Sequence, residues 1–175
     1  MPQRPLEEQI PEVYRQTIGP LYRYVSRRCA GERALAEDVV QETWLRAVDA
    51  WRTQGLPDTP AAWLMTVARH LLINHFRRRR PVALESVSAE TVLAVVDDGL
   101  ATESEEIATL IQWGLAQMPQ RQAAVLEAFH LDERPVARIA EDLRLSERAV
   151  EGRLRRARIK LRRVVERALA KRGRP

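Results

Sequence analysis

Three features are scarce in this sequence, and each shortage excludes a class of protein. A single cysteine, Cys29, is present, which excludes an internal disulfide and a cysteine metal cluster. Glycine is scarce, with 7 residues in 175, and no glycine-rich phosphate-binding loop occurs. No apolar run approaches the roughly 18 residues of a membrane span, and residues 1–12 lack the apolar stretch of a signal peptide. We therefore expect a cytoplasmic protein without a cofactor.

Basic residues are missing from one long stretch of an otherwise basic chain. The net charge is +5 and the isoelectric point is about 10.1, which indicates an anionic partner. Residues 1–80 hold 13 basic and 9 acidic residues. Residues 81–112 hold 7 acidic residues and no basic one, and residues 113–175 hold 16 basic and 8 acidic residues. Two basic blocks are thus separated by a purely acidic segment.

The composition and the apolar spacing both predict helices. Ala, Leu, Arg and Glu dominate, and 45% of the residues are hydrophobic, which favours an all-α chain with a core. Residues 81–103 show no clear 3.6-residue period, so we interpret them as a linker that holds at most a short helical turn. We predict an all-α protein of two small helical domains, residues 6–80 and 104–167, joined by this acidic flexible linker, residues 81–103.

Residues 135–162 have the pattern of a helix-turn-helix. Leu145 is placed to fill the turn, Ser146 to cap the second helix, and Arg144 stands where such a turn usually has a left-handed glycine. The buried positions of the two helices are predicted to be Val136, Ile139, Ala140, Leu143, Val150, Leu154, Ala157 and Leu161. A helix of this kind fits the major groove of DNA. The candidate DNA-binding residues are Arg148, Glu151, Gly152, Arg155 and Arg156, with Arg158, Lys160, Arg162 and Arg163 placed for phosphates.

The helix expected over residues 60–80 mixes aromatic and basic side chains. Such a mixture suits unpaired DNA, because rings stack on bases while guanidinium groups hold phosphates. The alternatives are a core role for Trp63 and a solvated helix end for the four arginines. The candidates for DNA binding are Trp63, Arg69, His70, Asn74, Arg77, Arg78, Arg79 and Arg80. His70 and His75 lie five residues apart and do not share a helix face, so no metal site is expected.

One short helix displays polar and acidic residues that nucleic-acid binding does not explain. It covers residues 36–51, "AEDVVQETWLRAVDAW", and its buried face is predicted to hold Val40, Trp44 and Ala47. The opposite stripe consists of Asp38, Gln41, Glu42, Leu45 and Asp49.

Four segments, in order, resemble motifs of the sigma-70 family of bacterial RNA polymerase sigma factors. They are "AEDVVQETWLRA", "AAWLMTVARHLLINHFRRRR", "LAQMPQRQAAVLEAFHLD" and "RIAEDLRLSERAVEGRLRRAR". The likeness is to the small two-domain extracytoplasmic function (ECF) group, and it covers about residues 10–80 and 104–165. It implies an alternative sigma factor that binds core RNA polymerase and directs promoter-specific initiation by recognising −35 and −10 elements and melting the DNA.

The resemblance also implies a role for each segment. The 36–51 stripe would dock on the coiled coil of the polymerase β′ subunit. The loop that begins at Gln54 would capture a flipped base of the −10 element, which residues 62–77 would read and melt. The linker would run toward the RNA exit channel, and the second helix of the helix-turn-helix would read the −35 element. His70, Glu151 and Gly152 depart from the residues common in relatives, so the promoter sequence stays open.

The partners implied in this way are core polymerase (the β′ coiled coil and the β flap), promoter DNA and an anti-sigma factor. Two alternatives remain. A stand-alone helix-turn-helix regulator would bind duplex DNA without polymerase, but would leave the 36–51 stripe unexplained. An enzyme, such as a small nuclease or phosphotransferase, would need a metal-ligand cluster or a nucleophile–base pair, and neither is recognisable in the sequence. We therefore expect no enzymatic activity.

Overall fold

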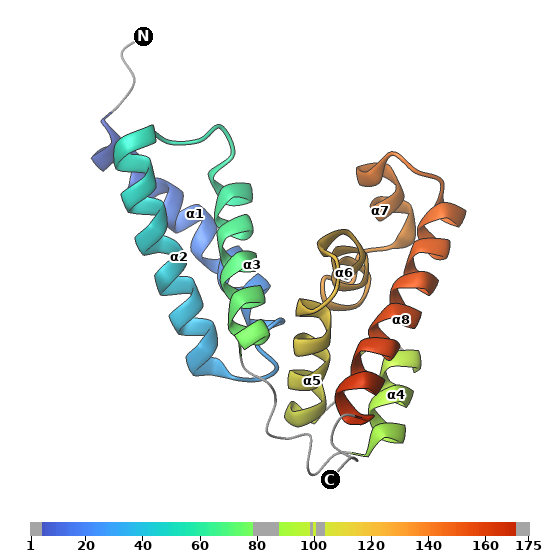
Figure 1. The fold of residues 1–175 in the computed structure, drawn as a ribbon. Helices are drawn as coiled ribbons and strands as arrows, with labels where there is room; N and C mark the ends of the chain where they lie inside the picture. The colour runs from blue at the N-terminus through green and yellow to red at the C-terminus, as the bar shows by residue number, and fades with distance from the viewer. Residues whose placement is uncertain (1–4, 79–87, 99, 101–103, 171–175) are drawn as a thin grey trace. The chain divides into compact units, whose positions relative to one another are not determined.

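The computed structural model describes residues 5–78, 88–98, 100 and 104–170, and all regular elements in these ranges are helices. The chain divides into two compact units, residues 1–75 and 76–175 (Figure 1). In the first unit lie α1 (Leu6–Ser26), α2 (Arg33–Gln54) and most of α3 (Pro60–Arg78). The second unit holds α4 (Ala89–Asp98), α5 (Glu105–Ala116), α6 (Gln120–Leu126), η2 (Glu127–Leu131), α7 (Val136–Leu143) and α8 (Glu147–Ala170). No helix in the described ranges is both long and apolar enough to cross a membrane.

Helix α1 is continuous although it contains two prolines, Pro11 and Pro20. A proline inside a helix removes a backbone hydrogen bond and costs about 3 kcal/mol. Burial compensates for this cost, because Leu21 and Val25 are fully buried against the rest of the unit. The packing of α1 on α2 therefore keeps this segment as one continuous helix despite its two prolines.

A row of aromatic rings connects the three helices of the first unit. Tyr14 of α1 lies 5.0 Å from Trp44 of α2, measured between ring centroids. Trp44 in turn lies 5.8 Å from Trp51, the next tryptophan of α2. Trp51 lies 5.6 Å from Trp63 of α3. Tilted and edge-on ring pairs of this kind each add about 0.5–1.5 kcal/mol beyond the area they bury. Because Trp44 and Trp51 lie about two turns apart on one face of α2, the row joins α1 and α3 to that same face.

The boundaries of α2 and α3 follow local sequence signals. Helix α2 ends before Gly55, whose φ of 80° is a positive value that glycine adopts without steric strain. Helix α3 begins at Pro60, as predicted, because a proline in the first turn lacks only an N–H that would be unpaired there anyway.

The core of the second unit forms where α5, α6 and α7 meet α8. Leu126, Val150, Leu161 and Val165 are fully buried in it. Gly114 of α5 faces α8 so closely that an added Cβ would lie 2.8 Å from Leu161 Cδ1. The small residue at this position therefore sets how near the two helices approach.

The helix-turn-helix forms as predicted from α7 and α8. Arg144 ends α7 in the left-handed conformation, with φ 52° and ψ 49°, and the Leu145 N–H donates to the Ala140 carbonyl at 2.9 Å. The Ser146 hydroxyl accepts from the Ala149 N–H at 3.2 Å and so caps α8. Leu143 differs from the prediction, since it is 41% exposed and stands as the last residue of α7.

One part of the acidic segment, Ala89–Asp98, forms a helix longer than the short turn that the sequence indicated. Helix α4 has ten residues and lies alongside the C-terminal part of α8 (Figure 1). Val92 and Val96, one turn apart, are fully buried in the same core as Leu161 and Val165 of α8. Full burial of a valine contributes about 1.5–3 kcal/mol, so these two side chains account for the docking. The predicted linker thus contains a helix that belongs to the second unit.

Candidate functional site

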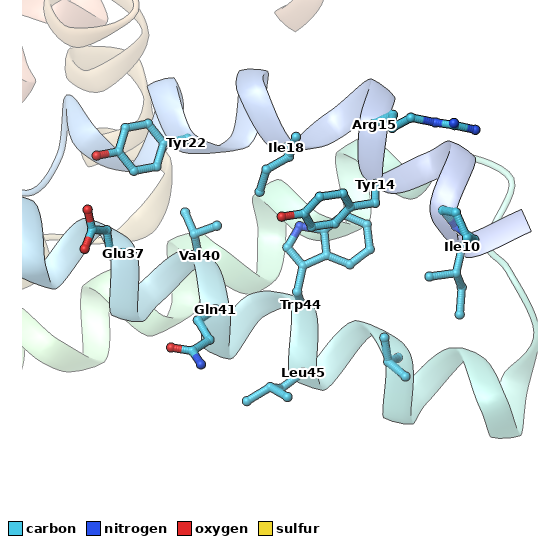
Figure 2. A pocket seen from close by; sticks show the side chains of 12 residues that line it. Ile10, Tyr14, Arg15, Ile18, Tyr22, Glu37, Val40, Gln41, Trp44 and Leu45 are labelled. Atoms are coloured by element: carbon cyan, nitrogen blue, oxygen red, sulfur yellow. The ribbon is translucent and has the colours of Figure 1, made fainter. Parts of the chain in front are cut away.

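An apolar groove of about 670 Å³ runs between α1 and α2. Figure 2 shows Tyr14 and Trp44 meeting between the two helices, with Gln41 and Leu45 on the outer side of α2. The residues that line the groove are Ile10, Pro11, Tyr14, Arg15, Ile18, Tyr22, Glu37, Val40, Gln41, Trp44, Leu45 and Val48. Most of them are hydrophobic or aromatic, which is typical of a surface that receives apolar side chains.

Two of the groove residues are large apolar side chains that solvent reaches. Leu45 is 57% exposed and Tyr14 is 45% exposed. The other exposed large hydrophobic residues of the described chain, Leu143 and Ile159, lie in the second unit. Exposed apolar side chains gathered at a groove indicate an interaction surface.

The stripe predicted from the sequence borders this groove. Gln41 and Leu45 line it directly, whereas Asp38, Glu42 and Asp49 lie beside it on α2. Asp38 and Asp49 are exposed, and Glu42 accepts a hydrogen bond of 2.7 Å from Arg46 Nε. The arrangement is therefore an apolar groove with an acidic margin along α2.

Helix α3 presents a second surface. His70, Asn74 and Arg77 are exposed and recur at spacings of four and three, so they share one face. Trp63 is half-buried and rests on Trp51, which supports a structural role for one side of its ring. Arg69 is half-buried, while Gln54 and Arg78 are exposed. Arg79 and Arg80 lie outside the described residues.

Helix α8 presents a third, basic surface. Arg148, Glu151 and Arg155 are exposed along one stripe of the helix, and Arg156 is exposed beside Gly152 on the neighbouring stripe. Lys160 is half-buried. An exposed basic helix face that begins just after a tight turn has the form needed to enter a groove of duplex DNA.

Arg158 does not project freely from this surface. Its Nη2 lies 3.1 Å from His130 Nε2 in η2, and its side chain is half-buried. A guanidinium can only donate hydrogen bonds, so the imidazole Nε2 must accept and His130 must be neutral. Burial and the charge of Arg158 lower the pKa of His130 to about 4. In this structure Arg158 thus makes a contact inside the second unit, and its contact with a phosphate stays a prediction.

Two other chemical possibilities receive no support. Burial and the nearby Glu32 raise the pKa of the Cys29 thiol to about 12, which leaves it protonated and unreactive at neutral pH. Within the described ranges, His, Cys, Asp and Glu side chains form no group of three that could hold a metal ion.

Comparison with known proteins explains why these three surfaces occur together. The family model "Sigma-70 region 2" matches residues 13–82, and "Sigma-70, region 4" matches residues 110–161. The ECF RNA polymerase sigma factor SigL of Mycobacterium tuberculosis is 35% identical over 145 residues, which cover 81% of this chain and 80% of SigL. The chain belongs to the ECF sigma factors of the sigma-70 family.

Other ECF sigma factors agree with this assignment. SigF of Caulobacter vibrioides is 31% identical over 77% of this chain and 73% of its own length. SigW of Bacillus subtilis is 27% identical over 77% of this chain and 78% of its own length. This ECF sigma factor is an alternative sigma factor that directs transcription initiation, acting with core RNA polymerase and promoter DNA. A helix-turn-helix regulator that acts without polymerase is not favoured, and sigma factors are generally regulators rather than enzymes.

Sequence reasoning missed the contribution of α1 to the first surface. No residue of the α1 segment was assigned to an interaction surface from the sequence. The signal was present, because Ile10, Tyr14, Ile18 and Tyr22 recur every four residues. Helical geometry places these positions on the same broad face as the buried Leu21 and Val25. Tyr14 on this face is 45% exposed, so part of the apolar face of α1 is left open to a partner.

Proposed function

We propose that the groove between α1 and α2, together with the stripe on α2, is where this ECF sigma factor binds core polymerase. The observation that carries the proposal is the exposure of Tyr14 and Leu45 at the groove, beside the acidic Asp38, Glu42 and Asp49. Apolar anchors in a groove supply binding energy, and charges at the margin orient the partner. In this proposal, which follows the resemblance, the partner is the helical coiled coil of the β′ subunit.

We infer that α3 and the loop before it act on the −10 element. In this proposal the loop that starts at Gln54 receives a flipped base, while His70, Asn74 and Arg77 follow the unpaired strand along one exposed face of α3. Arg69 and Arg78 add positive charge, and Trp63 offers the part of its ring that Trp51 leaves uncovered. Opening of the duplex is stabilised by capture of unpaired bases, so no covalent step is needed.

We infer that α8 reads the −35 element. Its N-terminal half carries Arg148, Glu151 and Arg155 on the exposed face, where the first turns of a recognition helix meet base edges. By resemblance, the second unit also contacts the β flap, and an anti-sigma factor holds the protein inactive until a signal arrives. A protein that works with bacterial RNA polymerase would act in the cytoplasm.

The docking proposal is tested by replacing its exposed anchor. Leu45→Arg places a charge in the groove and should weaken binding to core polymerase by about 30-fold or more, corresponding to the loss of a hot-spot residue worth about 2 kcal/mol. The double change Asp38→Arg, Glu42→Arg reverses the charge of the margin and should act in the same direction. Binding is measured by biolayer interferometry with sigma-free core enzyme.

Leu143→Arg is the matched control, since Leu143 is also an exposed leucine of a helix but lies in the second unit, outside the groove. It should leave affinity for core polymerase almost unchanged. Transcription of fragmented genomic DNA in vitro, with sequencing of RNA 5′ ends, then reports promoter use. Equal affinity of the Leu45→Arg and Leu143→Arg proteins for polymerase would exclude the groove as the docking site.

A further inference from the structure

The acidic helix α4 is seated on the basic helix α8. Residues 88–98 carry Glu90, Asp97 and Asp98 and no basic residue, whereas α8 carries a long series of arginines. Burial of Val92 and Val96 holds α4 in place, and this burial brings Asp97 to the surface of α8. The opposite charges therefore meet at a defined position.

That position is Arg162. Its Nη1 donates to Asp97 Oδ2 at 2.9 Å, and its Nε donates to Glu166 Oε1 at 3.0 Å. Arg162 follows Arg148 and Arg155 at intervals of seven residues, which is close to two helical turns, so the three lie near one another around the helix axis. Arg162 therefore continues the exposed arginine stripe of α8, and a carboxylate of α4 occupies it.

A carboxylate and a DNA phosphate use the same donors on a guanidinium. We propose that α4 competes with duplex DNA for Arg162, so that the docked helix lowers the affinity of α8 for DNA and DNA binding weakens the docking of α4. The inference rests on the proposal that α8 faces duplex DNA. The acidic segment then restrains the free protein, in addition to joining its two parts.

The structure makes such an exchange reversible. The Asp97–Arg162 pair is solvent-exposed, with 51% and 44% of the respective side chains accessible, and exposed ion pairs are weak. A helix of ten residues is marginal in water without tertiary contacts. Helix α4 should therefore lose its hydrogen bonds when its docking weakens, which makes its state measurable through amide exchange.

The test compares two neutralised carboxylates of α4 in the full chain. Asp97→Asn releases Nη1 of Arg162 and leaves its Nε on Glu166, whereas Glu90→Gln removes the same charge from an exposed position in the first turn of α4. Affinity for a 30-base-pair duplex of random sequence is measured by fluorescence anisotropy at several salt concentrations. Asp97→Asn should bind several-fold more tightly than Glu90→Gln, and its salt slope should be steeper by about one phosphate contact, or roughly 0.9 in log–log units.

Arg162→Gln completes the cycle. It should cost several-fold more affinity in the Asp97→Asn background than in the parent chain, because only there can Nη1 of Arg162 donate to a phosphate without displacing Asp97. Equal losses in both backgrounds, or equal affinities of the Asp97→Asn and Glu90→Gln proteins, would overturn the competition. In hydrogen exchange, α4 amides of the parent chain should lose protection when duplex is added, and unchanged protection at saturating duplex would likewise refute it.

Arg155→Gln separates this inference from the proposal beneath it. If α8 faces the duplex, this change weakens binding in every background, whatever α4 does. Loss of affinity with Arg155→Gln but no effect of Asp97→Asn would reject the competition alone. No effect of Arg155→Gln would reject the placement of DNA on α8, and the competition with it.

Discussion

His130 and Arg158 form a contact whose strength depends on the charge of one partner. Arg158 Nη2 donates to His130 Nε2 at 3.1 Å. The rings of His130 and Phe129 meet edge to face, with their centroids 4.8 Å apart. Protonation of His130 would remove the acceptor and place two positive charges together. The residue lies in η2, a π-helical segment, and π-helical turns commonly mark functional positions.

The lowered pKa of His130 predicts a pH dependence of stability. In the unfolded chain the pKa is about 6.5, and in the folded protein it is about 4. Between these values the unfolded state binds more protons, so the free energy of unfolding decreases as the pH falls from about 6.5 toward 4. This contribution is fully present above pH 6.5.

His130→Gln keeps an acceptor for Arg158 but does not titrate. Urea unfolding, followed by circular dichroism at several pH values between 4 and 7.5, should show a smaller loss of stability on acidification in this variant than in the parent chain. The carboxylates titrate in both proteins, so the difference isolates His130. Parallel pH profiles would show that the contact does not control the protonation of His130.

At the scale of elements, one glycine decides how α5 meets α8. A Cβ on Gly114 would lie 2.8 Å from Leu161 Cδ1 and 3.2 Å from Val165 Cγ2, and both neighbours are fully buried. Gly152, in α8 itself, has only the guanidinium of Arg156 within 4 Å of its added Cβ, the nearest atom at 3.4 Å. The two glycines thus differ in packing although both are helical.

Alanine substitution at these glycines should change stability in opposite directions. Gly152→Ala should stabilise the second unit by about 0.5–1 kcal/mol through helix propensity. In Gly114→Ala the same gain is opposed by overpacking, which costs about 1–3 kcal/mol, so net destabilisation is expected. Urea unfolding measures both variants, and stabilisation by Gly114→Ala would show that α5 and α8 can separate without cost.

At the scale of the whole molecule, each unit has buried leucines of its own. Leu21 in the first unit and Leu161 in the second are both fully buried. Leucine-to-alanine changes at such positions cost about 2–5 kcal/mol, and chains with more than one domain often unfold in more than one step. A stability change can therefore be confined to one unit.

Thermal unfolding of two variants should show this separation. Leu21→Ala should lower the transition of the first unit and Leu161→Ala that of the second, with the other transition nearly unchanged in each case. Segment-resolved hydrogen exchange assigns each transition, because it reports amides of α2 and α8 separately. A single transition that moves equally in both variants would indicate that the units unfold together.

Local rules were enough to predict much of the fold. Gly55 and Pro60 mark the loop between α2 and α3, Ser146 caps α8, and the left-handed turn at Arg144 follows from the helix-turn-helix pattern. Helical spacing alone identified Val150 and Leu154 as buried. These features depend on backbone conformation and residues a few positions apart, which a sequence displays directly.

The functional surfaces needed more than local rules. Gln41 and Leu45 were predicted on α2, but the groove exists only because α1 brings Tyr14 against Trp44, thirty residues away. The sequence predicted that Arg158 contacts a phosphate, but it could not show that the Arg158 side chain also lies against His130 of η2. That contact depends on η2 packing beside α8.

The sequence by itself determined the helices, the helix-turn-helix, the separation of charge into blocks and the sigma-factor family. Only the tertiary structure decided that the acidic segment forms a helix seated on α8, with Asp97 on Arg162. The physical reason is that two valines one turn apart are too weak a pattern to define a helix of ten residues. They become stabilising only when a partner helix, more than sixty positions further along the chain, buries them.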